Sequence, residues 1–381
     1  MARDDKRKIR VSFRKNRNTR ARQNDWTKAR EDDAADAISS ERLSGKGDLT
    51  RRRTVVTSAD NPDGLRDVDL AQCVPGRVLW TVGANHSAVE LDDGTVKHCS
   101  VRRVLRTRER ETRSLVVAGD RVMVRPTERE EGVIERIELR TSTISRMSGR
   151  FQQVLTANVD QAVIVVSADD PPLKLGVVDR FLVGAEKGGV RGVVCINKAD
   201  LVNPVLLQPI AGQYARIGYD VVLVSARLGL GIEELRQRLI GHQSVVAGQS
   251  GVGKSSLLNC VQPGLAQRTG GVSEETGKGT HTTRVAELFR LEGGGWVVDT
   301  PGIRQLMLWD VARGELEGLF PEFRPYVPDC RFASCSHLVE KDCAVQAAIE
   351  RGDISPLRYE TYTRMFNQDD DPAWAAPEDL E

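Results

Sequence analysis

The central part of the chain alternates between short apolar runs and longer amphipathic segments. Nearly every residue is apolar in QAVIVVS (161–167), RGVVCIN (191–197), YDVVLVS (219–225) and QSVVAG (243–248). Such runs are typical of strands buried on both faces. Helical periodicity marks LGVVDRFLVGAEKG (175–188) and GIEELRQRLI (231–240), and FRLEGGGWVVDT (289–300) adds a strand pair. The pattern predicts a doubly wound α/β domain with a mostly parallel sheet.

Residues 73–140 have a different pattern, with short β-rich runs about every ten residues. These are GRVLWTV, SAVEL, VKHCSV, GDRVMVRP and EGVIERIEL, with the turn DDGT after the second. They predict a small barrel of about five strands. An oligonucleotide-binding (OB) barrel is one candidate, favoured by a surplus of arginines, and a barrel without a ligand is the alternative. The arginines are Arg102, Arg103, Arg106, Arg108, Arg110 and Arg113.

The two ends of the chain are oppositely charged. Residues 1–30 hold twelve Lys or Arg residues, whereas residues 369–381 are acidic. Residues 1–70 show no sustained periodicity, so we expect them to be disordered with at most one short helix. They are either a basic arm for RNA phosphates or a solvated tail. The predicted organisation is a basic extension at 1–70, an OB-like barrel at 71–140, the α/β domain at 145–309, an α-rich module at 310–368 and an acidic tail at 369–381.

The overall composition limits the class of protein. A chain of 381 residues with 40% hydrophobic residues can bury two or three cores. It contains no run of 18 apolar residues and no apolar signal core, so we expect no membrane association and a cytoplasmic location. The seven cysteines, an odd number and scattered except for the last three, favour a reducing compartment over a disulfide framework.

The sequence GQSGVGKS at 248–255 matches the phosphate-loop pattern between a predicted strand and a predicted helix. Backbone N–H groups of such a loop turn toward phosphates, Lys254 would reach the β- and γ-phosphates, and Ser255 would bind Mg²⁺. The alternative is a glycine-rich structural turn. The predicted nucleotide-binding residues of this loop are Gly248, Gln249, Ser250, Gly251, Val252, Gly253, Lys254, Ser255 and Ser256.

A second Mg²⁺ contact is expected from DTPG, about 45 residues later. Asp299 ends an apolar strand and would hold Mg²⁺ through water, while the Gly302 N–H would sense the γ-phosphate. Between the two motifs lies the polar segment GGVSEETGKGTHTTR (270–284), which is typical of a loop ordered by γ-phosphate and Mg²⁺. Thr282 or Thr283 would supply another Mg²⁺ ligand, and we favour Thr283.

The base-reading motif precedes the phosphate loop. NKAD places Asn197, Lys198 and Asp200 at a strand end, where the carboxylate can accept both N1–H and N2–H₂ of guanine. The next strand ends in SAR, so Ser225 and Ala226 would complete the base site, with a backbone N–H toward guanine O6. The motif order is therefore that of a circularly permuted GTPase. An ATPase is the alternative.

The pattern does not identify the residue that positions the attacking water. Ile303 stands where many GTPases have a glutamine, and its side chain cannot orient water. His281 is the nearest candidate for catalysis, the alternative being that it only caps its loop.

Cysteine and histidine gather near the C-terminal end. CRFASCSHLVEKDC has the spacing C-x₄-C-x-H-x₅-C, formed by Cys330, Cys335, His337 and Cys343. Three thiolates and an imidazole make a closed tetrahedral set, which is typical of structural Zn²⁺. Disulfides are the alternative, and the odd thiol count disfavours them.

Together these motifs resemble the RsgA (YjeQ) family over residues 73–367. The resemblance implies a permuted GTPase acting late in small ribosomal subunit assembly, with GTP and Mg²⁺, a structural Zn²⁺ and contact with 16S ribosomal RNA. It also implies hydrolysis stimulated by the subunit, with His281 positioning the water. The chain has DTPG where the family more often has DSPG. The threonine retains the hydroxyl group of the serine. We expect a monomer that leaves the subunit on hydrolysis. The alternative is a nucleotide-gated RNA-binding module with incidental hydrolysis.

Overall fold

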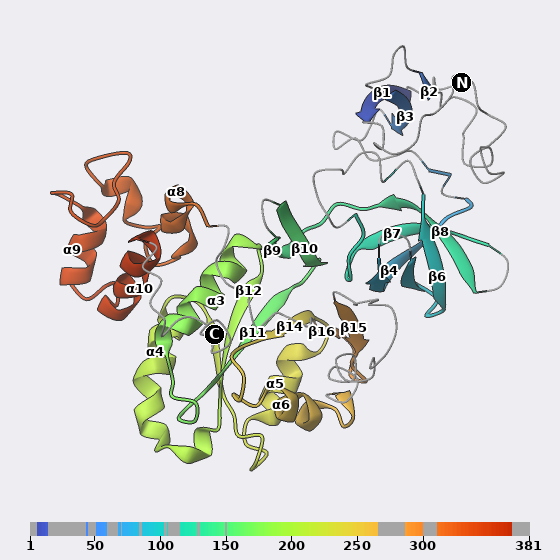
Figure 1. Cartoon of the computed structure of the whole chain (residues 1–381). Coiled ribbons are helices and arrows are strands. Elements are labelled where there is room, and N and C mark those ends of the chain that lie inside the picture. Colours follow the sequence, from blue (N-terminus) through green and yellow to red (C-terminus); the bar gives the residue numbers. More distant parts are fainter. Residues whose placement is uncertain are drawn as a thin grey trace, which may run out of the picture. The chain divides into compact units, whose positions relative to one another are not determined.

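The computed structural model describes residues 6–13, 43–44, 51–58, 68–69, 71–83, 86–102, 105, 115–127, 130–148, 151–265, 286–299 and 311–367. The chain divides into two compact units, Met1–Arg140 and Thr141–Glu381 (Figure 1). Among the described residues, none of the helices combines the length and the apolar content that crossing a bilayer requires.

The basic extension contains strands that we did not predict. β1 (Lys6–Phe13) pairs antiparallel with β3 (Arg51–Ser58), and β2 (Leu43–Ser44) pairs with the same strand. This differs from the expected disorder or short helix. The signal was present in β1, because Ile9, Val11 and Phe13 alternate with polar residues, which is the period of a strand.

A closed five-strand barrel follows in the first unit. Its strands are β4 (Val74–Val82), β5 (His86–Leu91), β6 (Val96–Val101), β7 (Arg121–Pro126) and β8 (Glu131–Ile137). They pair in the order β4-β5-β6-β8-β7, and β7 returns to β4. Only the β6–β8 pair is parallel. Apolar side chains including Val78, Val89, Val124 and Ile134 fill the interior. The predicted OB-like barrel is confirmed.

The second unit is built on the predicted parallel sheet. Its strands are β11 (Gln161–Ser167), β12 (Arg191–Asn197), β13 (Asp220–Leu223), β14 (Gln243–Ala247), β15 (Glu287–Arg290) and β16 (Trp296–Asp299). They follow the order β13-β12-β11-β14-β16-β15, and only β15 is antiparallel to its partner β16. The strands before β14 in the sequence thus lie on one side of it, and those after it lie on the other.

Helices cover both faces of this sheet. α5 (Ile232–Leu239) and α6 (Lys254–Val261) share a core with Val163, Val165 and other residues of one face. α3 (Leu175–Lys187) contacts β11 and β12, and α4 (Gln208–Arg216) contacts β13. Gly192 of β12 lets Leu182 of α3 approach the sheet closely. The hairpin of β9 (Thr143–Ser148) and β10 (Phe151–Ala157) leads into the sheet.

The C-terminal module is α-rich, as predicted. It contains α8 (Arg313–Leu316), α9 (Ala344–Glu350) and α10 (Pro356–Asn367), with the 3₁₀ turns η5 (Glu317–Leu319) and η6 (Val327–Asp329). Phe320, Phe323 and Tyr362 are fully buried in its core. Val183 of α3 belongs to the same core, so this module packs directly on the α/β domain.

Candidate functional site

The phosphate loop connects β14 to α6 and depends on its glycines. Gly248 has φ +145°, and a Cβ there would lie 2.1 Å from the Val165 carbonyl oxygen. Gly253 has φ +92°, and a Cβ there would lie 2.4 Å from Asn197 Nδ2. Residues other than glycine are therefore excluded at both ends of the loop, because a Cβ would clash with a neighbouring strand and the backbone would be strained.

Lys254 folds back over this loop. Its ammonium donates to the carbonyl oxygens of Gly248 at 2.7 Å and Gln249 at 2.6 Å. Ser255 and Ser256 are exposed in the first turn of α6, whose N-terminal N–H groups carry partial positive charge. The loop thus gathers an ammonium, two hydroxyls and a helix N-terminus, a combination that suits phosphate groups.

Asn197 joins the base-reading loop to the phosphate loop. It ends β12 and is 1% exposed. Its Nδ2 donates to the Val252 carbonyl oxygen at 2.8 Å, and its Oδ1 accepts from the Ala226 N–H at 3.2 Å. One amide side chain therefore holds three loops, which follow β12, β13 and β14, at the carboxyl edge of the sheet. That edge is where ligands of doubly wound sheets bind.

Asp200 and Ser225 face one another across two of these loops. The Ser225 hydroxyl donates to Asp200 Oδ1 at 2.6 Å and accepts from the Leu228 N–H at 3.1 Å. The Ser225 hydrogen bond lowers the pKa of the Asp200 carboxyl from its ordinary value. The carboxylate is ionised near neutral pH in any case, and the hydrogen bond fixes its position as an acceptor.

Lys198 takes the left-handed backbone conformation, with φ +58°. Its ammonium donates to the carbonyl oxygen of Asp170 in the loop between β11 and α3, and lies 3.9 Å from that residue's carboxylate. The sequence did not point to this loop, because no motif marks residues 168–174.

The remaining predicted residues are only partly described. Asp299 ends β16, and its backbone pairs with Glu287 of β15. Its side chain lies outside the described part of the chain, as do His281, Thr282, Thr283, Gly302 and Ile303.

The predicted metal ligands come together in the C-terminal module. The ligand atoms of Cys330, Cys335, His337 and Cys343 all lie within 4.8 Å of one another. His337 Nδ1 is 3.5 Å from Cys330 Sγ and 3.4 Å from Cys343 Sγ, and the two sulfur atoms are 4.0 Å apart. Zn–S bonds of about 2.3 Å at tetrahedral angles separate two sulfur ligands by roughly 3.8 Å, so this set fits a zinc ion.

Burial supports the same assignment. His337 is fully buried, and Cys335 and Cys343 are 8% and 5% exposed. Burial raises the pKa of the Cys335 thiol to about 12, so a bound cation is needed for this residue to be a thiolate near neutral pH.

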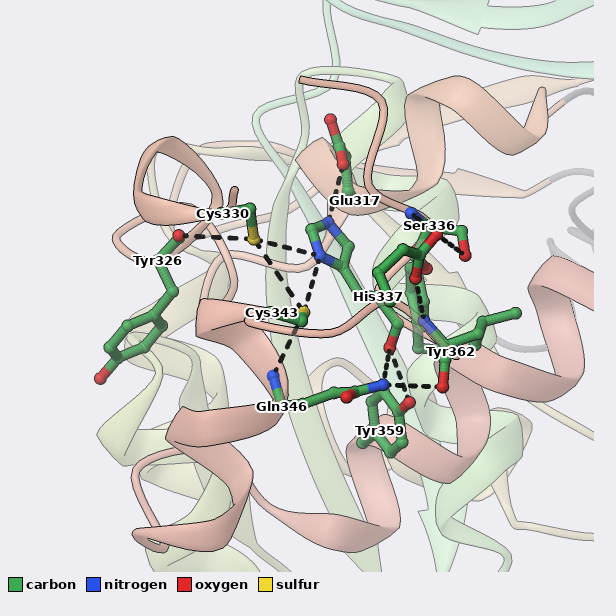
Figure 2. A network of polar contacts seen from close by, with 11 residues as sticks. Glu317, Tyr326, Cys330, Ser336, His337, Cys343, Gln346, Tyr359 and Tyr362 are labelled. Atoms are coloured by element: carbon green, nitrogen blue, oxygen red, sulfur yellow. Dashed lines mark hydrogen bonds and ion pairs between the residues drawn. The ribbon is translucent and has the colours of Figure 1, made fainter. Parts of the chain in front are cut away.

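Glu317 orients the imidazole. His337 Nε2 lies 2.9 Å from Glu317 Oε2, while Nδ1 faces the sulfur atoms (Figure 2). A carboxylate on the second ring nitrogen fixes the tautomer in which the first nitrogen is free to bind metal. The sequence did not reveal this residue, which precedes the first cysteine by 13 positions.

Side chains around the cluster hold its backbone in place. The Tyr359 and Tyr362 hydroxyls donate to the carbonyl oxygens of His337 at 2.7 Å and Ser336 at 2.9 Å. Glu340 accepts from Ser336 N at 2.8 Å and from its hydroxyl at 2.6 Å, and this hydroxyl lowers the pKa of Glu340 to about 2. None of these supports had been predicted.

Comparison with known proteins places this geometry in a family. The family described as RsgA GTPase matches residues 137–309. The "Small ribosomal subunit biogenesis GTPase RsgA" of Chlorobaculum parvum is 41% identical over 312 residues, which cover 79% of this chain and 99% of that protein. The protein of the same name from Ectopseudomonas mendocina is 44% identical over 256 residues, covering 66% and 74% of the two chains.

Solved structures agree with the sequences. YjeQ from Thermotoga maritima matches with a TM-score of 0.65 and 36% identity, over 78% of this chain and 98% of that one. The circularly permuted GTPase YloQ matches with a TM-score of 0.61 and 28% identity, over 79% and 97%. The strand order around β14 and the motif order are those of a permuted domain. The chain therefore belongs to the RsgA family of circularly permuted GTPases.

Proposed function

We propose that this protein is a Mg²⁺-dependent GTPase that binds the small ribosomal subunit, assists its late maturation and leaves after hydrolysing GTP to GDP and phosphate. The observation that carries the proposal is the pair of Asn197 hydrogen bonds, to Val252 O and from Ala226 N, which brings the base-reading and phosphate loops together. The names of the relatives, small ribosomal subunit biogenesis GTPases, supply the partner.

In this proposal the base site is selective for guanine. The Asp200 carboxylate accepts N1–H and N2–H₂, Lys198 lies along the ring, and the Ala226 N–H turns from Asn197 toward O6. Ser225 orients the carboxylate through its 2.6 Å hydrogen bond. Adenine offers no matching pair of donors, which argues against an ATPase.

The phosphates bind to the N–H groups from Gln249 to Ser256, and the Lys254 ammonium moves from its carbonyl partners to the β- and γ-phosphates. Ser255, Thr283 and Asp299 would hold Mg²⁺, which neutralises charge on the transferring phosphoryl group. Gly302 N–H binds the γ-phosphate. His281 positions the attacking water, a task that Ile303 cannot perform.

The metal-binding module and the barrel serve the partner. Cys330, Cys335, His337 and Cys343 hold one structural Zn²⁺ with no position open for catalysis. The barrel and the basic extension contact 16S ribosomal RNA, and the protein acts as a cytoplasmic monomer.

Turnover measurements test the proposal. GTP hydrolysis by the purified protein should rise at least tenfold on adding small ribosomal subunits. His281→Ala should lose this stimulated turnover and keep GTP affinity. Absence of stimulation by the subunits would reject the ribosomal role.

Ile303 favours one alternative, a nucleotide-gated RNA-binding module in which hydrolysis is incidental, because the usual water-orienting amide is missing. Under that alternative, His281→Ala would change neither turnover nor release from RNA.

A further inference from the structure

α3 is preceded by a loop that adjoins both halves of the nucleotide site. The loop before it, residues 168–174, is hydrogen-bonded to the base-reading loop, since Ala168 N donates to Asn197 O at 2.8 Å and Lys198 Nζ donates to Asp170 O. Pro171 Cδ would lie 3.8 Å from a Cβ built on Gly251 of the phosphate loop. A rearrangement of either loop thus acts on the N-terminal end of α3.

One turn further along, α3 carries a buried carboxylate. Asp179 is 1% exposed, and Oδ1 accepts from Arg358 Nη1 and from the Tyr214 hydroxyl, both at 2.8 Å. Its Oδ2 accepts from the Thr361 hydroxyl at 2.9 Å. Arg358, also 1% exposed, donates to both oxygens of Glu322 at 2.6 and 3.1 Å. The buried ion pair Asp179–Arg358 therefore joins the α/β domain to the C-terminal module, and Glu322 of the same module holds the other side of Arg358.

The helix that supplies Arg358 and Thr361 also supports the metal cluster. α10 carries Tyr359 and Tyr362, whose hydroxyls bind the carbonyl oxygens of His337 and Ser336. A displacement of α10 would therefore pull on the backbone at a metal ligand.

We propose that the Asp179–Arg358 pair is a positioning device that links nucleotide binding to retention of metal by the cysteine–histidine cluster. The inference rests on the proposed function, since it takes guanine nucleotide as the ligand. Nucleotide fixes the base-reading and phosphate loops, these fix the start of α3, and α3 fixes α10 through Asp179. A buried carboxylate transmits position well because any shift would leave charges unpaired in the interior.

Two exposed ion pairs cross the same boundary, Lys187–Glu315 at 3.0 Å and Arg324–Glu186 at 2.6 Å. Solvent screens such pairs and their long side chains readily change conformation, so they transmit little. They provide matched controls for the buried pair.

The rate of zinc transfer from the zinc-loaded, full-length protein to a chromogenic chelator tests the linkage, with saturating GDP and without it. Transfer from the unmodified protein should be at least threefold slower with GDP. Thr361→Val removes one donor to Asp179 at nearly constant volume, and Asp179→Asn removes the charge. Asp179→Asn should bring the ratio of the two rates close to one and Thr361→Val should lower it, whereas Lys187→Ala should leave it unchanged.

The proposal is overturned if GDP does not slow transfer from the unmodified protein, or if Thr361→Val and Asp179→Asn keep the full ratio. Circular dichroism shows whether each variant is folded, and Thr361→Val provides the test if Asp179→Asn does not fold. Titration with a fluorescent GDP distinguishes a failure of the proposed function from a failure of the linkage. Absence of binding would reject the proposed function, whereas binding without an effect on zinc transfer would reject only the linkage.

Discussion

The Asn197 Nδ2 atom lies 2.8 Å from the carbonyl oxygen of Val252, so a residue of the base-reading motif holds the phosphate loop in place. The contact joins residues that are 55 positions apart in the sequence. The phosphate loop and the base loops therefore depend on one buried side chain.

Asn197→Ala should weaken binding of GDP and GTP together. The buried Val252 carbonyl would lose its partner and the phosphate loop would lose its link to the base loops, so nucleotide would have to order them on binding; the cost of one unsatisfied buried group, about 1–3 kcal/mol, corresponds to roughly 5- to 150-fold in affinity. Titration with fluorescent GDP measures the loss. Asn203→Ala is the matched control, because Asn203 only caps an exposed turn through Val205 N at 3.1 Å. Equal affinities for the two variants would contradict the bridging role.

Gly253→Ala should weaken nucleotide binding and lower stability. The new Cβ would lie 2.4 Å from Asn197 Nδ2 at a φ of +92°, so either the loop or the Asn197 side chain must move. Fluorescent GDP titration and urea unfolding measure the two effects. Gly212→Ala in α4 meets no atom within 4 Å, and it should leave GDP affinity unchanged and stabilise the fold by about 0.5–1 kcal/mol. A Gly253→Ala variant that binds GDP normally would rule out this steric explanation.

The pH dependence of guanine binding should report the Asp200–Ser225 hydrogen bond. The pKa of Asp200 is lowered from 3.8, so the carboxylate stays ionised above that lowered value and guanine affinity is lost only as the pH falls through it. Ser225→Ala should raise this pKa toward 3.8 and move the acid limb of GDP binding to higher pH. The affinity is measured from pH 7 down to values below 3.8, so that the titration of both proteins is covered, with circular dichroism to follow folding. An unchanged acid limb in Ser225→Ala would show that another group controls it.

Cys335→Ser should release the metal and destabilise the C-terminal module. The ligands lie in residues 330–343, which form neither a helix nor a strand, and a structural zinc ion contributes much of the folding free energy of such segments. Elemental analysis should find about one zinc per chain in the unmodified protein and far less in the variant, with a lower melting temperature. Cys73→Ser, in the first unit, should keep both values. Full zinc content in Cys335→Ser would exclude this thiol as a ligand.

Glu317→Gln should reduce zinc affinity without abolishing it. The carboxylate lies 2.9 Å from His337 Nε2 and favours the tautomer with Nδ1 free. Loss of such a partner typically costs 10- to 100-fold in metal affinity. Competition with a chelator of known affinity measures the change. Glu315→Gln, which removes an exposed partner of Lys187, should have no such effect, and a similar loss in both variants would point to a general disturbance of the module.

Patterns of apolar residues predicted the sheet well. The runs at 161–167 and 191–197 coincide with β11 and β12, since strands buried on both faces leave little choice of residue. α4 was missed because Pro209 and Gly212 weaken its helical signal and only Tyr214 in it is buried. Strand β1 was missed because its alternation lies within an arginine-rich segment, and β3 was missed because its residues do not alternate.

The site was predictable where chemistry demands fixed spacing along the chain. The phosphate loop, NKAD and the metal ligands are local patterns of this kind. Glu317, Tyr359 and the pair Asp179–Arg358 become neighbours only in the folded chain, the last across 179 positions. A carboxylate or hydroxyl has no local signature when its partner comes from a distant helix.

Val183 contributes to the core that contains Phe320 and Tyr362, although it belongs to α3. A fragment beginning at residue 311 would therefore lack part of its own hydrophobic core. It would also expose Arg358 to solvent without its partner Asp179. The metal-binding module is thus not an independent folding unit that could be moved to another protein. Its sequence is constrained by the surface of the domain it covers, and chimaeras between relatives should keep α3 and α10 from the same parent.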